Sequence, residues 1–93
     1  MMAAIEEKVV VIKSTDMSEE MQEEVIRVAS EALELYSFEK DIAAHVKREF
    51  ESGNTGSWNC IVGKNFGAFV AHEQGKFIYL YIGNIAFMLF KSG

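Results

Sequence analysis

The most constraining feature of this chain is an uncharged run near its C-terminal end, FIYLYIGNIAFMLF, which covers residues 77–90. A helix that spans a membrane needs roughly 18–20 apolar residues, so this run is too short to be one. The Gly83-Asn84 pair in its middle is typical of a two-residue hairpin turn between β-branched and aromatic segments. We therefore expect two adjacent buried strands, residues 77–82 and 85–91.

A second segment, KNFGAFVAHE at residues 64–73, has apolar side chains on both sides when residues 65–72 are read as a strand. An antiparallel strand in a small domain normally shows water one polar face. The chain has only 93 residues, 49% of them hydrophobic, and so short a chain has little interior in which to bury them. We therefore expect oligomerisation to cover the second face.

The N-terminal half predicts a strand followed by a helix. Residues 9–13, VVVIK, are β-branched and favour a strand. Asp16 or Ser18 is the expected N-cap of the first helix, because acidic residues follow in its first turn. The apolar residues of this helix recur at helical spacing, at Met21, Val25, Val28, Ala29, Ala32, Leu33 and Tyr36.

A second helix is expected directly after the first. Ser37 is a candidate N-cap, and Gly53 is a candidate stop signal. The apolar residues between them recur every four positions, at Phe38, Ile42, Val46 and Phe50. With further strands at residues 58–63, 65–72, 77–82 and 85–91, the order β-α-α-β-β-β-β predicts an α+β fold in which two helices pack on an antiparallel sheet.

The chain is expected to form one domain over residues 1–93, with residues 1–8 as a flexible N-terminal extension. It contains no proline, and its only linker-like stretch is ESGNTGS at residues 51–57. The formal net charge of −5 and the absence of a basic stripe argue against nucleic acid as a partner. A single cysteine and a charged N-terminal segment without signal-peptide character favour a reducing cytoplasmic location.

Catalytic and metal sites find little support in the residue pattern. An enzyme would use Cys60 as nucleophile and His72 or His45 as base, but Cys60 lies in an apolar strand where a packed, unreactive thiol is expected. No close pair of zinc ligands occurs, and neither glycine-bearing segment has P-loop spacing. We therefore predict no enzymatic activity, no metal and no cofactor.

Several motifs in register resemble one family along most of the chain. The segments are DMSEEMQ, FEKDIAAHVKREF, WNCIVGKNFGAFVAHE, FIYLYIG and the terminal LFKSG, and together they extend from about residue 9 to residue 93. They are similar to the small dimeric cytoplasmic dynein light chains, which are hub proteins associated with the dynein motor and microtubules. Several separate motifs in order are far more specific than any one short pattern.

The resemblance implies a symmetric homodimer in which residues 65–72 cross over and pair with the partner's strand at residues 58–62. Extended segments of client proteins, including dynein intermediate chain, would then add as antiparallel strands in two grooves at the dimer interface. By this resemblance the dimer interface comprises Trp58, Asn59, Cys60, Ile61, Val62, Lys64, Asn65 and Phe66. No membrane partner is implied, and a purely structural dimer without clients is the alternative.

The peptide-binding residues implied by the resemblance lie in four parts of the sequence. Glu39 and Lys40, at the start of the second helix, match the pair that meets a client's central glutamine. The others are Lys13, Asn65, Phe66, Gly67, Ala68, Phe69, Val70, Ala71, His72, Phe77, Tyr79 and Tyr81.

Some positions depart from the family pattern. Ala68, Phe69 and Ala71 stand where the family commonly has three hydroxyl-bearing residues, so we hypothesise weaker or altered recognition of Thr-Gln-Thr type clients, with more apolar client residues tolerated. Asn59 replaces a histidine that the family usually places at the dimer seam, which predicts a dimer less sensitive to mild acid. Ser92 matches a serine implied to act as a phosphorylation switch.

Overall fold

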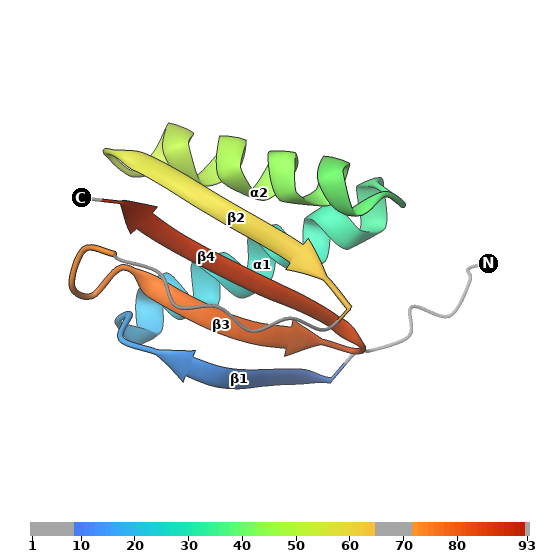
Figure 1. Cartoon of the computed structure of the whole chain (residues 1–93), viewed down its shortest axis with the longest axis horizontal. Coiled ribbons are helices and arrows are strands. Elements are labelled where there is room, and N and C mark those ends of the chain that lie inside the picture. The colour runs from blue at the N-terminus through green and yellow to red at the C-terminus, as the bar shows by residue number, and fades with distance from the viewer. Residues whose placement is uncertain (1–8, 65–71, 93) are drawn as a thin grey trace.

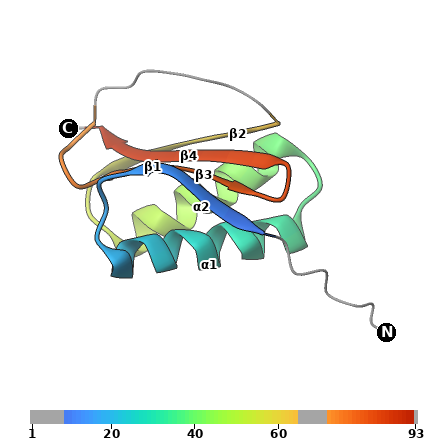
Figure 2. The same ribbon diagram turned by 90° about the horizontal axis from the view of Figure 1, so that it is seen from below.

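A computed structural model of the chain describes residues 9–64 and 72–92. Within these ranges the elements follow in the order β1 (Val10–Thr15), α1 (Glu19–Leu35), α2 (Glu39–Gly53), β2 (Ser57–Gly63), β3 (Phe77–Ile82) and β4 (Ile85–Ser92). Both helices lie on one side of a single sheet (Figure 2). The α+β fold expected from the sequence is therefore confirmed. The strand expected at residues 65–72 lies outside the described residues, except for His72, which is not in a strand.

The four described strands form an antiparallel sheet in the order β1-β3-β4-β2 (Figure 1). The strands β3 and β4 form the central hairpin, as the uncharged run predicts, and β1 and β2 are the edges. Gly83 has a φ of 62° while no non-glycine residue has a positive φ, among the described residues. A positive φ at the first turn residue alone is the pattern of a type II′ turn, which explains why glycine comes first in the Gly83-Asn84 pair.

The core lies between the sheet and the two helices. Strand β3 alternates strictly, with Ile78, Leu80 and Ile82 buried and the residues between them only partly covered. Trp58 of β2 packs edge-to-face on Phe50 of α2 with ring centroids 4.9 Å apart, and both side chains are fully buried. Each such side chain stabilises the fold by about 1.5–3 kcal/mol through its removal from water.

The start of α1 agrees with the sequence pattern. Ser18 is the N-cap, and its Oγ accepts a hydrogen bond from the Met21 N–H at 3.2 Å. Asp16, the other candidate, has a different function: its carboxylate accepts hydrogen bonds from the N–H groups of Gly75 and Phe77 at 2.8 and 3.0 Å. This side chain ties the end of β1 to the start of β3.

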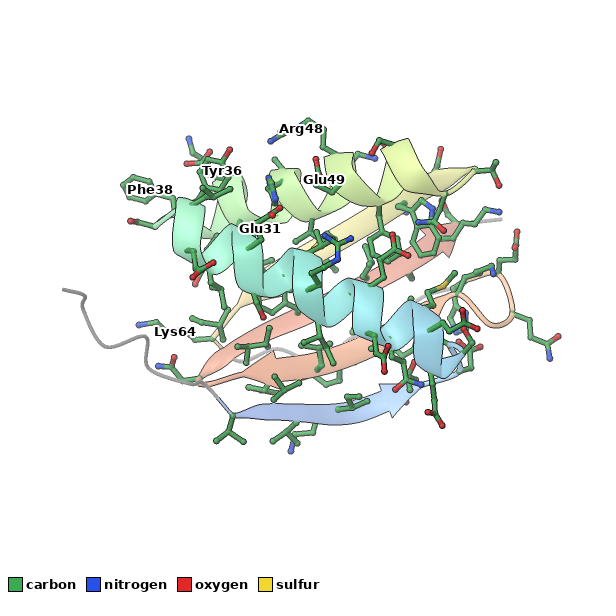
Figure 3. The ribbon with its side chains drawn as sticks, turned by 180° about the vertical axis from the view of Figure 1, so that it is seen from behind. Glu31, Tyr36, Phe38, Arg48, Glu49 and Lys64 are labelled. Carbon is green, nitrogen blue, oxygen red and sulfur yellow. The ribbon has the colours of Figure 1, made fainter. Side chains whose placement is uncertain are left out.

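The start of α2 differs from the prediction. Phe38, not Ser37, is the N-cap, and its side chain offers no acceptor to the first helical N–H groups. Phe38 shares the four-residue spacing of the buried Ile42 and Val46, but it is 69% exposed (Figure 3). Its extended φ and ψ of −96° and 138° place it outside the helical turn, so it does not share the inward direction of Ile42 and Val46. The helix does end at Gly53, followed by an extended Asn54.

Candidate functional site

The sheet face that points away from the helices, called the outer face below, is largely apolar at its centre. Its register places Tyr79 beside Met88 and Met88 beside Ile61, across three strands. Ala86 and Met88 are buried on this face although they lie outside the core cluster beneath the helices. The registers also place Val11, Ser14, Ser57, Asn59, Gly63, Phe77, Tyr81, Phe90 and Ser92 on this face, and Lys13 lies against Tyr81 there. An antiparallel sheet whose outer face is in contact with water normally carries polar side chains along that face.

A row of aromatic rings follows β3 along the outer face. His72 stacks on Phe77 with centroids 4.8 Å apart, and the Tyr79 and Tyr81 rings lie 5.9 Å apart. The Lys13 Nζ lies 5.6 Å from the centroid of the Tyr81 ring, within cation–π range. The structure thus places five of the predicted peptide-binding residues along one row: Lys13, His72, Phe77, Tyr79 and Tyr81.

The hydroxyl groups of this row are hydrogen bonded to each other. The Tyr79 hydroxyl donates to the Tyr81 hydroxyl at 3.4 Å. This bond, followed by partial burial, raises the pKa of Tyr79 above its ordinary value. Tyr79 therefore stays a neutral hydroxyl at physiological pH, able to donate or accept.

Glu39 and Lys40 lie at the exposed start of α2. The first N–H groups that bond the Phe38 carbonyl belong to Asp41 and Ile42, each at 3.0 Å. The N–H groups of Glu39 and Lys40 precede them, and the Phe38 side chain has no acceptor for either. A carboxamide oxygen at this helix start would find donors and a favourable dipole. Because α2 packs on β2, this site is separated within one protomer from the aromatic row on β3.

The strand expected at a dimer seam, β2, is an edge of the sheet, and its side chains divide between two faces. Asn59 and Ile61 lie on the outer face, whereas Cys60 and Val62 pack against the core beneath the helices. Trp58 is fully buried in the same core. Cys60 and Val62 can therefore contribute to a seam only through their backbones, whereas the Trp58 backbone is already bonded by Lys47 and Glu51 of α2. Lys64 follows the strand and is exposed (Figure 3).

Neither Cys60 nor the histidines form a catalytic arrangement. Burial raises the pKa of the Cys60 thiol to about 12, so the nucleophilic thiolate is scarce at neutral pH. His45 Nε2 instead bonds Glu31 at 2.9 Å, and His72 Nδ1 lies 3.0 Å from the Glu73 carbonyl oxygen. Within residues 9–64 and 72–92, no three metal-ligating side chains gather in one place.

The C-terminal residue of β4 is linked to the edge strand. The Asn59 Nδ2 donates to the Ser92 Oγ at 3.2 Å, and Ser92 is exposed. Asn59, which is expected at the dimer seam, is thus hydrogen bonded to Ser92, which is expected to be phosphorylated.

Two contacts of the site were not foreseen from the sequence. One is the Asp16 carboxylate at the start of β3, described above. The other is a pair on α2, Lys47 and Glu51, whose side chains both bond the backbone of Trp58. The i, i+4 spacing of Lys47 and Glu51 is typical of a salt bridge on a helix, but nothing in the sequence indicated that both side chains would bond β2.

Neither described helix is long and apolar enough to traverse a lipid bilayer.

Comparison with known proteins identifies the family. The family model for dynein light chain type 1 matches residues 9–92. A curated relative, the cytoplasmic dynein light chain of Emericella nidulans, is 57% identical over 81 residues, covering 87% of this chain and 86% of that protein.

Solved structures share the fold at low identity. The dynein light chain-like domain of the Fasciola hepatica calcium binding protein FhCaBP2 superposes with a TM-score of 0.76 at 19% identity, covering all of both chains. The DLC-like domain of CsTAL3 gives a TM-score of 0.72 at 14% identity over 88% of this chain and 90% of that one. With a family match along nearly its whole described length and a close curated relative, the chain belongs to the dynein light chain type 1 family.

Proposed function

We propose that this protein is a non-catalytic dimeric adaptor that binds extended segments of client proteins by β-strand addition. Family membership supports the coarser part of this function, an adaptor associated with dynein. The observation that carries the finer part is the apolar outer face with its aromatic row, set between two edge strands. Such a face suits a second copy of the chain, and open edges suit an added strand.

In the proposed dimer, residues 65–72 of one protomer pair with β2 of the other. The position of β2 at the edge of its own sheet supports this exchange, because an edge strand has one row of backbone groups that no strand of its own sheet bonds. Asn59 and Ile61 would then face the seam through their side chains, and Cys60 and Val62 through their backbones. The Trp58 backbone is already bonded by Lys47 and Glu51 of its own α2. Residues 65–71 lie outside the described residues.

The proposed client groove combines the aromatic row of one protomer with the α2 start of the other. Within one protomer these two parts are separated, so a single groove needs both chains. A client strand would pair with the crossed segment, while the Glu39 and Lys40 N–H groups receive a glutamine side chain. Two symmetric grooves would hold two client chains together, at an effective concentration of the order of millimolar.

Dynein intermediate chain and other partly disordered proteins are the proposed clients, and the cytoplasm, on dynein and microtubules, is the proposed location. The name of the relative from Emericella nidulans supports this location. Phosphorylation of Ser92 would place a double negative charge beside Asn59 at the proposed seam, where repulsion and desolvation oppose association.

Sedimentation and peptide titration test the function together. We expect a dimer at micromolar concentration and one Thr-Gln-Thr type peptide per protomer, with amide shifts in β3 and at Glu39 and Lys40. The variant with Ala71→Thr and Phe69→Tyr should bind that peptide more tightly, by roughly fivefold to tenfold for each restored hydrogen bond. A monomer, or a peptide that shifts other residues, would contradict the proposal, and a dimer that binds no peptide would indicate a purely structural dimer.

A further inference from the structure

Two side chains of α2 reach the free edge of β2 and bond its backbone. The Lys47 Nζ donates to the Trp58 carbonyl oxygen at 2.7 Å, and the Trp58 N–H donates to Glu51 Oε2 at 3.0 Å. Lys47 and Glu51 also bond each other at 2.7 Å. Together they supply one donor and one acceptor to one residue, which is what a neighbouring strand would supply.

The bonded groups of Trp58 point away from the sheet. Trp58 is paired with Lys91 of β4, yet the Lys91 N–H donates to the Lys76 carbonyl and the Lys91 carbonyl accepts from the Glu73 N–H. Trp58 and Lys91 are therefore a non-hydrogen-bonded pair, and the Trp58 backbone groups face the free edge.

The same alternation exposes two further residues of β2. Cys60 and Val62 lie two and four positions after Trp58, so their N–H and C=O groups also point to the free edge. Neither residue makes a hydrogen bond at that edge to any described residue. The free edge thus consists of one residue occupied by α2 and two that can pair with another strand.

Trp58 itself is held firmly in place. Its indole Nε1 donates to the Thr55 carbonyl at 3.3 Å, and its ring packs on Phe50 in the core. The Lys47 and Glu51 side chains are anchored on the helix that covers the same strand. A strand that paired along β2 beyond Cys60 would therefore have to displace the two side chains that already bond the Trp58 backbone.

We propose that Lys47 and Glu51 form a register stop, which ends strand pairing on β2 at Cys60 and so fixes the register of the added strand. The added strand comes from a second copy of this chain. The reason is that Ile61 of β2 lies beside Met88 on the outer face, so a second copy paired with β2 would also cover the apolar centre of that face. This inference rests on the proposed function, since it refines the interface of the proposed dimer. A one-residue slip would turn every side chain of the added strand to the wrong face.

A double substitution and a matched control separate the effect of the two hydrogen bonds to Trp58 from a general effect of charge. The test variant is Lys47→Met with Glu51→Met, which keeps unbranched side chains and helix propensity but removes both hydrogen bonds. The control is Arg48→Met with Glu49→Met on the same helix, where both side chains are exposed (Figure 3). Each double variant removes one positive and one negative charge, so the net charge stays the same.

The readout is the set of interchain contacts in mixed dimers with one isotope-labelled protomer, measured by NMR. Wild type and control should show one register, with interchain contacts at Cys60 and Val62 and none at Trp58. The test variant should show contacts extending to Trp58, or a second set of Cys60 and Val62 resonances at roughly a tenth or more of the main intensity.

Three outcomes would overturn the register stop. Interchain contacts at Trp58 in the wild type would do so without any variant, even if the test variant failed to fold. A test variant with the same single register as the control would also do so, and both results leave the proposed dimer intact. A wild-type protein that is monomeric, or whose β2 edge binds only a foreign peptide, would instead remove the dimer and the register stop together.

Discussion

Phe38 and Phe50 belong to the same four-residue repeat of the sequence but have opposite surroundings. Phe50 is fully buried against Trp58, whereas Phe38 is 69% exposed at the start of α2. Phe50→Ala should lower the free energy of unfolding by about 3–5 kcal/mol, because it leaves a cavity in the core. Phe38→Ala should change it by less than about 0.5 kcal/mol. Urea unfolding at one fixed protomer concentration checks both, and equal losses would contradict the assignment of the core.

Cys60 gives a second prediction at the residue scale. Burial raises the pKa of its thiol to about 12, so the thiolate fraction at neutral pH is far below that of an exposed cysteine. A thiol reagent such as DTNB should label the native protein at pH 7.5 at least about a hundredfold more slowly than the same protein in urea. Native labelling at a rate close to the unfolded one would reopen Cys60 as a nucleophile.

At the scale of single elements, Glu51 links helix α2 to strand β2 in a pH-dependent way. The hydrogen bond from Lys47, followed by the one from the Trp58 N–H, lowers the pKa of Glu51 below its ordinary value of 4.5. A lowered pKa in the folded state means that the stabilisation is fully present above pH 4.5 and is lost as the pH falls through the lowered pKa. The wild type should therefore lose some stability in acid that Glu51→Gln does not lose.

The measurement is the urea midpoint of wild type, Glu51→Gln and the control Glu49→Gln from about pH 6 to about pH 3. Glu49 is exposed on the same helix, so its variant should follow the wild type. If the urea midpoints of wild type and Glu51→Gln change in parallel with pH, ionisation of Glu51 does not contribute to the stability of the fold.

Local patterns predicted the elements, and contacts between distant segments had to come from the structure. The hairpin of β3 and β4 was predictable because Gly83 and the alternation of Ile78, Leu80 and Ile82 are local signals. The contacts of Asp16 were not, since its carboxylate bonds residues about sixty positions away while Ser18 caps α1. The apolar pattern of residues 64–73 and the hydrophobic content of so short a chain predict a surface that needs a cover, but the separation of Glu39 from the aromatic row follows only from the strand order.

For the molecule as a whole, Asn59 bears on how the proposed dimer responds to acid. It lies on the outer face of edge strand β2, opposite Phe90, and its side chain is hydrogen bonded to Ser92. The asparagine side chain does not become protonated in mild acid, so this position stays neutral as the pH falls. Asn59→His would place there a group that titrates near pH 6.5, and burial at a seam opposes the charged form.

We therefore expect the wild type to remain dimeric from about pH 7.5 to about pH 5.5, while Asn59→His dissociates as the pH falls below about 6.5. Sedimentation at low micromolar concentration measures this, and Asn59→Gln is the matched control, because it alters size without adding a titratable group. Equal dissociation of wild type and Asn59→His would contradict the prediction and move the source of acid sensitivity to His45, which bonds Glu31, or to His72, which lies 4.0 Å from Asp16. His45→Gln and His72→Gln would then decide between them, since only loss of the responsible imidazole restores the dimer in acid.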